Sequence, residues 1–160
     1  MTARALSFLV LGTLPWLASC RDPAAAPPVA VTPPPVAKPA AVPARTVPGK
    51  VTAIDITALF PRQQSGSVLI YDARPSFVAA FGRIPGAISW PRSDFEARLA
   101  IHEAEIRAAK KAGKPVVFYC TDAECPDAGA MARQLADKGH DVSILEGGFA
   151  IWKEAGLPTE

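Results

Sequence analysis

The chain has 160 residues, a formal net charge of +2 and 20% charged residues, which indicates one modest globular domain with additional segments. Its lysines and arginines form no cluster and no interleaved aromatic platform, so the sequence excludes a typical nucleic-acid-binding protein. The cysteine and histidine spacings match no closed zinc site, and we expect neither a metal nor an organic cofactor.

Residues 1–19 have the pattern of an export signal. Arg4 gives a positive start, residues 5–17 are nearly all apolar, and small residues follow. The apolar stretch is short for a membrane span. The ending Leu17-Ala18-Ser19-Cys20 resembles a bacterial lipobox, in which Cys20 is lipidated and becomes the first mature residue. The alternatives are an ordinary secreted protein cut near Cys20 and an uncleaved anchor.

We therefore expect a protein of the cell envelope that is lipid-anchored through Cys20 and faces the periplasm. Arg21 follows that cysteine in place of an acidic residue, which favours the outer membrane over the inner one. Residues 20–49, beginning with the lipidated cysteine, are rich in proline and alanine, a composition typical of an extended tether.

Residues 50–160 are enough for one domain with a single hydrophobic core. Apolar runs predict strands over residues 67–71, 87–90, 116–119 and 142–145. Helical spacing predicts helices over 54–60 (closed by Pro61), 76–81, 93–111 (opened by a Ser93–Glu96 capping box), 127–138 and after Gly148. Strands that alternate with helices predict an α/β fold, a parallel sheet covered on both faces. His102 and His140 are expected at the surface.

Cys120 follows the apolar strand 116–119 directly, and a polar loop separates it from the helix at Asp127. This order places the cysteine at the carboxyl end of a parallel strand, where open α/β sheets bind their ligands. Backbone N–H groups of the loop and the positive end of the next helix would lower the thiol pKa, which suits a sulfur nucleophile. The alternative is a buried cysteine that only fills space.

Four motifs, in this order, resemble those of the rhodanese-like family. They are Tyr71-Asp72-Ala73-Arg74, Gly82-Arg83-Ile84-Pro85-Gly86-Ala87, Val117-Phe118-Tyr119-Cys120, and Leu145-Glu146-Gly147-Gly148-Phe149-Ala150-Ile151-Trp152 followed by Gly156-Leu157-Pro158. The resemblance implies a five-stranded parallel sheet with helices on both faces. It also implies that Cys120 accepts sulfane sulfur as a persulfide and passes it to a nucleophilic acceptor.

The loop after Cys120 departs from the family pattern, in which an Arg or Lys attracts anionic donors. Its residues are Thr121, Asp122, Ala123, Glu124, Cys125 and Pro126. We expect backbone N–H groups of residues 121–126 to stabilise the thiolate and the persulfide. The loop is longer than usual and has no basic residue, whereas Asp122, Glu124 and Asp127 are acidic. Because carboxylates near the sulfur repel anions, we expect weak turnover of thiosulfate.

Three other residues have expected roles around Cys120. Cys125 lies in the same loop and reaches disulfide range if the loop folds back, which predicts a resolving thiol. The alternative is a partly exposed thiol of no consequence. Asp72 and Arg74 are expected to pair with each other or with the neighbouring loop, and so to shape the rim of the pocket.

The leading functional prediction is a sulfurtransferase or persulfide carrier that uses Cys120. The expected partners of the protein are a small sulfur-containing donor, a thiol acceptor and the membrane. The sequence does not identify a protein partner. A second reading is thiol–disulfide exchange by Cys120 and Cys125. A third is a non-catalytic binding module that docks a membrane neighbour.

The lipobox interpretation predicts that Cys20→Ala yields a soluble, unlipidated protein, because the substitution removes the only thiol at the cleavage position. Fractionation of cells that express the parent or the variant is the measurement. Recovery of both proteins in the membrane fraction to the same extent would refute the anchor.

Overall fold

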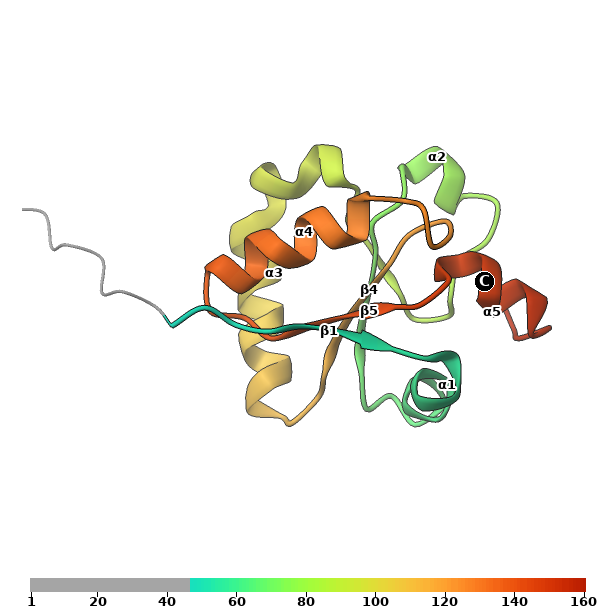
Figure 1. Ribbon diagram of the computed structural model, residues 1–160, viewed down its shortest axis with the longest axis horizontal. Helices are drawn as coiled ribbons and strands as arrows, with labels where there is room; N and C mark the ends of the chain where they lie inside the picture. The colour runs from blue at the N-terminus through green and yellow to red at the C-terminus, as the bar shows by residue number, and fades with distance from the viewer. Residues whose placement is uncertain (1–46) are drawn as a thin grey trace, which may run out of the picture. The chain divides into compact units, whose positions relative to one another are not determined.

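The computed structural model describes residues 47–160 (Figure 1). The expected export signal, the lipid site at Cys20 and the tether up to residue 46 lie outside these described residues. Among the described residues, no helix has the length and apolar character needed to span a membrane.

Five parallel strands form one sheet in the order β1-β5-β4-β2-β3. The strands are β1 (Val51–Ile54), β2 (Leu69–Asp72), β3 (Ile88–Ser89), β4 (Val116–Tyr119) and β5 (Val142–Leu145). The helices are α1 (Ile56–Gln64), α2 (Ser76–Ala79), α3 (Phe95–Lys111), α4 (Asp127–Asp137) and α5 (Gly148–Glu154), with a 3-10 turn, η1 (Arg92–Asp94), before α3. The predicted α/β fold with a five-stranded parallel sheet and helices on both faces is confirmed.

Strand β4 divides the core into two halves. Val116 and Phe118 pack into one cluster with α3 and α4, whereas Val117 and Tyr119 pack into the other with α1 and α5. All four side chains are buried, as expected for a central parallel strand that has helices on both sides. The carboxyl end of β4 is therefore held from both faces of the sheet (Figure 1).

The N-terminal part of the domain differs from the sequence prediction. Residue Ile54 ends strand β1 instead of beginning a helix, and Pro61 lies inside α1 instead of closing it. The Asp55 carboxylate caps α1 by accepting the N–H of Ala58 at 2.9 Å. Pro61 has no N–H and so removes one backbone hydrogen bond from α1. The cap and the burial of Leu59 help to stabilise the helix in spite of this loss.

The predicted capping box at the start of α3 is wrong. Because residues 92–94 form η1, the Ser93 hydroxyl donates to the Asp94 carboxylate at 3.0 Å, and no side chain caps the helix.

The expected surface positions of the two histidines are also wrong. His102 lies under Trp90 with its Nδ1 2.8 Å from Glu105, and His140 is 8% exposed. The aromatic neighbours that cover His102 lie on other elements, which spacing along one helix does not show.

Asp72 and Arg74 form an ion pair inside the domain, with an Nη2–Oδ2 distance of 2.6 Å and side chains 0% and 3% exposed. Arg74 also donates to the carbonyl of Gly82 at 2.8 Å, and the Tyr119 hydroxyl donates to Asp72 at 2.7 Å. Burial raises the pKa of Tyr119, and the charge of Asp72 raises it further, so this hydroxyl remains a donor. The network joins β2 and β4 to the segment that begins at Gly82.

We expect Arg74→Met to lower the free energy of unfolding by about 3–5 kcal/mol, because it leaves the Asp72 carboxylate buried without its cation. Urea unfolding followed by circular dichroism is the measurement. Arg83→Met is the matched control: its pair with Glu160 is 42% and 43% exposed, so its loss costs at most about 1 kcal/mol. Equal losses in the two variants would contradict the structural role of the buried pair.

Candidate functional site

Cys120 directly follows β4, is 2% exposed and belongs to the buried cluster beneath α4. It forms a disulfide with Cys125, and the two Cα atoms lie 5.9 Å apart. That separation is ordinary for a disulfide. The loop therefore folds back on itself and brings together the two thiols that the sequence singled out.

The start of α5 holds the Cys120 end of this loop. The N–H of Phe149 donates to the Cys120 carbonyl at 2.8 Å, and that of Ala150 donates to the Thr121 carbonyl at 2.9 Å. Gly148 has a φ of +59°, and a Cβ there would lie 2.6 Å from the Cys120 carbonyl oxygen and 2.8 Å from the Asp122 nitrogen. The second glycine of the Gly147-Gly148 pair is therefore needed for both its φ and its close approach.

The Asp122 side chain holds the middle of the loop. Its carboxylate accepts the N–H of Cys125 at 3.0 Å, which is the Asx-type turn expected of such residues. Within residues 47–160, the N–H groups of residues 121–124 donate to no protein group. The expected set of donors, residues 121–126, is therefore smaller, because the Cys125 N–H donates to Asp122 and Pro126 has no N–H group. Glu124 and Pro126 are exposed.

Helix α4 begins at Asp127 with Pro126 before it, as predicted. The Asp127 carboxylate pairs with Arg92 at 3.1 Å. Sequence reasoning missed this arginine because η1 brings it from far along the chain. One carboxylate oxygen of Asp127 and the sulfurs of Cys120 and Cys125 lie within 4.8 Å of one another. In the disulfide neither sulfur is a thiolate, the form that binds metals.

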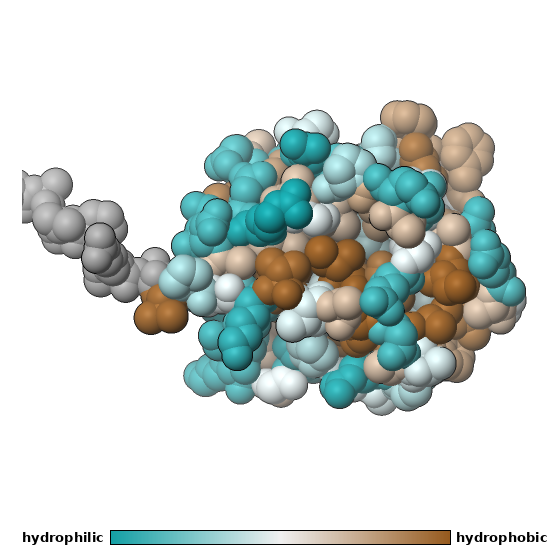
Figure 2. Space-filling view, viewed as in Figure 1, coloured by the Kyte–Doolittle hydropathy of each residue, from teal (hydrophilic) through white to brown (hydrophobic). Residues whose placement is uncertain are grey.

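A cavity of about 530 Å³ opens beside the disulfide. It is lined by Val51, Thr52, Ala53, Cys120, Asp122, Ala123, Cys125, Ala128, Ile144, Leu145, Glu146 and Gly147. The lining is mainly apolar and includes two carboxylates but no lysine, arginine or histidine. Figure 2 shows apolar side chains, bordered by hydrophilic ones, exposed on the face where β1 and β5 run. Glu146 was missed as a site residue, although it belongs to a motif visible in the sequence.

The expected rim residues lie elsewhere. Asp72 and Arg74 are both buried, at 0% and 2% exposure, and neither lines the disulfide cavity. Arg74 lines a smaller cavity of about 230 Å³ with Thr121 and the exposed Phe77 and Phe81. The pair thus holds β4 through Tyr119 and the segment around Gly82 through its carbonyl.

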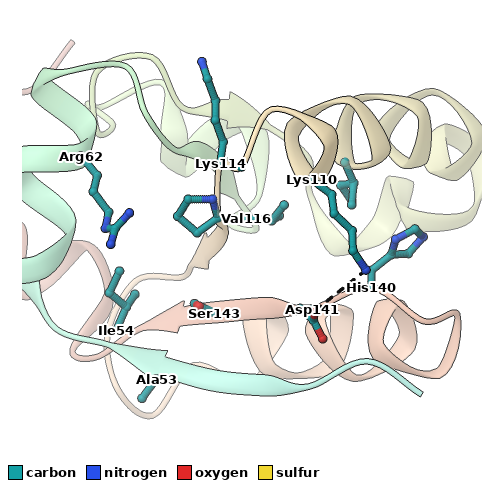
Figure 3. Close-up of a pocket in the computed structure, with 12 residues that line it drawn as sticks. Ala53, Ile54, Arg62, Lys110, Lys114, Val116, His140, Asp141 and Ser143 are labelled. Atoms are coloured by element: carbon teal, nitrogen blue, oxygen red, sulfur yellow. Dashed lines mark ion pairs between the residues drawn. The ribbon is translucent and has the colours of Figure 1, made fainter. Parts of the chain in front are cut away.

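Another cavity, of about 500 Å³, is lined by residues at and before the starts of β4 and β5, together with the end of β1 and Arg62 of α1 (Figure 3). Arg62, Lys110 and Lys114 contribute positive charges to it, and Asp141 lies 3.9 Å from the Lys110 ammonium. The domain therefore has a cationic cavity near the amino ends of these strands and an anionic one near their carboxyl ends.

The model of the family described as the rhodanese-like domain matches residues 58–155, more than half of the chain. The chain belongs to the rhodanese-like family. An HTH-type transcriptional regulator of Mycobacterium tuberculosis is 35% identical over 111 residues, which cover 68% of this chain and 44% of the regulator. The thiosulfate:glutathione sulfurtransferase of Homo sapiens is 36% identical over 78 residues, 45% of this chain and 65% of that enzyme.

Among solved structures, the rhodanese-related protein of Thermoplasma volcanium superposes with a TM-score of 0.56 at 23% identity, covering 68% of this chain and 97% of that protein. This likeness concerns the fold. The family match covers β2 to β5, the Cys120 loop and the Gly147-Gly148 start of α5, whereas β1 lies before it. The chain spans less than two thirds of the length of either curated relative.

We expect Gly148→Ala to destabilise the domain by at least about 2 kcal/mol and to lower the reactivity of Cys120, because the new Cβ displaces the loop. Urea unfolding and the rate of thiol alkylation after reduction measure the two effects. Gly156→Ala is the control, because Gly156 has a φ of +66° and a Cβ there would meet nothing within 4 Å, so this variant reports backbone strain alone. Equal alkylation rates in the two variants would refute the positioning role of Gly148.

Proposed function

We propose that the protein is a sulfurtransferase or persulfide carrier whose nucleophile is Cys120. The observation that carries this proposal is the position of Cys120: at the carboxyl end of β4, in a loop held by α5, in a chain of the rhodanese-like family. A curated relative named as a thiosulfate:glutathione sulfurtransferase supports the same reaction class.

In the proposed reaction the Cys120 thiolate attacks the sulfane sulfur of a donor. The donor's sulfur bond breaks, its electron pair leaves with the remaining fragment, and Cys120 holds a persulfide. An acceptor thiolate then attacks the outer sulfur and restores the Cys120 thiolate. The free N–H groups of residues 121–124 would stabilise the sulfur anion through preorganised hydrogen bonds.

The disulfide favours a second candidate, thiol–disulfide exchange by Cys120 and Cys125. It also suits a protective role within the first function. The Cys125 thiolate attacks the Cys120 persulfide at its inner sulfur and releases hydrosulfide, or it attacks a sulfenic acid on Cys120 and releases water. Both routes end in the disulfide, which a thiol reductant returns to two thiols.

For the location, the lipobox-like segment leads us to propose a lipid anchor at Cys20 and a place in the cell envelope, facing the periplasm, with the outer membrane favoured. In an oxidising compartment the Cys120–Cys125 disulfide persists without turnover. A thiol that reduces it is then needed before the first round of sulfur transfer, and again whenever the disulfide re-forms.

We expect the reduced protein to gain one sulfur atom on Cys120 when a sulfane-sulfur donor is added, as measured by intact mass spectrometry and peptide mapping. Cys120→Ser should abolish the gain, whereas Cys125→Ser should retain it and lose more activity than the parent under peroxide. Loss of loading in Cys125→Ser alone would assign the nucleophile to the other cysteine. Disulfide exchange without any sulfur gain in the parent would favour the second candidate.

A further inference from the structure

The cavity beside the disulfide carries negative charge that no protein cation balances. Asp122 and Glu146 line it, and no basic side chain does. Among residues 47–160, neither of these carboxylates forms an ion pair. Asp127, the third carboxylate near the sulfurs, differs because Arg92 lies 3.1 Å from it.

The basic side chains that face this part of the sheet line a different cavity. Arg62, Lys110 and Lys114 line the cavity at the amino ends of β4 and β5 (Figure 3). None of these three side chains lines the cavity beside the disulfide, although Ala53 lines both cavities. A charged ligand beside the disulfide therefore experiences mainly the two carboxylates.

The remaining lining is apolar and of small-molecule size. Val51, Ala53, Ala128, Ile144 and Leu145 contribute hydrophobic surface to about 530 Å³, within the range of small-ligand pockets. A short aliphatic chain fits this surface, and an ammonium group complements the rim. An anionic thiol or donor would place its charge against Asp122 and Glu146.

We infer that the acceptor of this site is a small aliphatic aminothiol, bound with its ammonium group near Glu146 and Asp122 and its sulfur toward Cys120. The inference rests on the proposed sulfur transfer and names its acceptor class. The aminothiolate attacks the outer sulfur of the Cys120 persulfide, the sulfur–sulfur bond breaks, and its electron pair returns to Cys120. The product is the aminothiol persulfide, and the step needs no oxidant. Two equivalents of thiol reduce the resting disulfide beforehand and leave as their own disulfide.

The test begins with reduced protein loaded by an alkyl persulfide, whose outer sulfur the Cys120 thiolate takes as the alkyl thiolate leaves, and then freed of excess donor. Sulfur transfer is then timed with cysteamine, its uncharged N-acetyl derivative and 3-mercaptopropionate, and the rates are compared per thiolate anion. We expect cysteamine to react about tenfold faster than the anionic thiol at low salt, with the neutral thiol between them. The difference should shrink at high salt because the charges are screened.

Glu146→Gln should reduce the preference for cysteamine by about threefold, because it removes one carboxylate from the rim. Glu154→Gln makes the same change of net charge on an exposed α5 residue outside the cavity, and it should leave the preference unchanged. Asp122 is unsuited to this test because its carboxylate also holds the loop.

The outcomes separate the two proposals. If the protein takes up sulfur but reacts equally with the three thiols, or if Glu146→Gln and Glu154→Gln behave alike, the aminothiol inference is wrong while sulfur transfer stands. If no sulfur is loaded from any donor, the proposed function itself fails. Rapid loading from the thiosulfate anion, at a rate that Glu146→Gln does not raise, would also overturn the inferred charge selectivity.

Discussion

The close contact between Gly148 and the loop after β4 is the constraint on which the rest of the site depends. Helix α5 can donate two N–H groups to the loop carbonyls only because no Cβ stands between Gly148 and the Cys120 carbonyl. This contact ties the Cys120 end of the loop to a helix whose Trp152 is fully buried. The position of the Cys120 sulfur is therefore set by contacts with the core.

The buried pair of Asp72 and Arg74 gives the same end of the sheet a second support. The Arg74 guanidinium carbon lies 4.1 Å from the centroid of the Phe149 ring. Because the Phe149 N–H donates to the Cys120 carbonyl, this contact connects the end of β2 to the Cys120 loop. A buried charge without its partner strongly destabilises the fold, so replacing either Asp72 or Arg74 alone is expected to be unfavourable. The pair acts on the site through position, since neither residue lines the disulfide cavity.

Much of the fold could be predicted where local pattern and tertiary environment agree. The bounds of β4 and β5 and the start of α4 follow from apolar runs ended by polar or turn-forming residues. Strand β1 was missed because its residues are mostly exposed and it is defined by pairing with β5 at the edge of the sheet. An edge strand of this kind carries little periodicity of its own.

The chemistry of the site was predictable only in part, for a related reason. Cys120, Cys125 and the acidic loop are neighbours in sequence, so their proximity is visible there. Glu146 and Arg92 reach the same region from β5 and η1, and only the folded chain brings them together. Arg92 offsets the charge of Asp127, whereas Glu146 adds a negative charge to the cavity. The charged residues between Cys120 and Asp127 therefore do not by themselves give the electrostatics of the site.

The two cysteines differ in how firmly they are held, and the roles proposed for them match this difference. Backbone groups fix both sides of Cys120: β4 precedes it, and α5 binds its carbonyl. Cys125 is held by one hydrogen bond, from its N–H to the Asp122 carboxylate, and by partly buried packing against the cluster beneath α4. When the disulfide is reduced, a change of conformation therefore costs less at Cys125 than at Cys120. In the proposed function, sulfur transfer and disulfide formation therefore use one stationary nucleophile, Cys120, which the second thiol approaches or leaves.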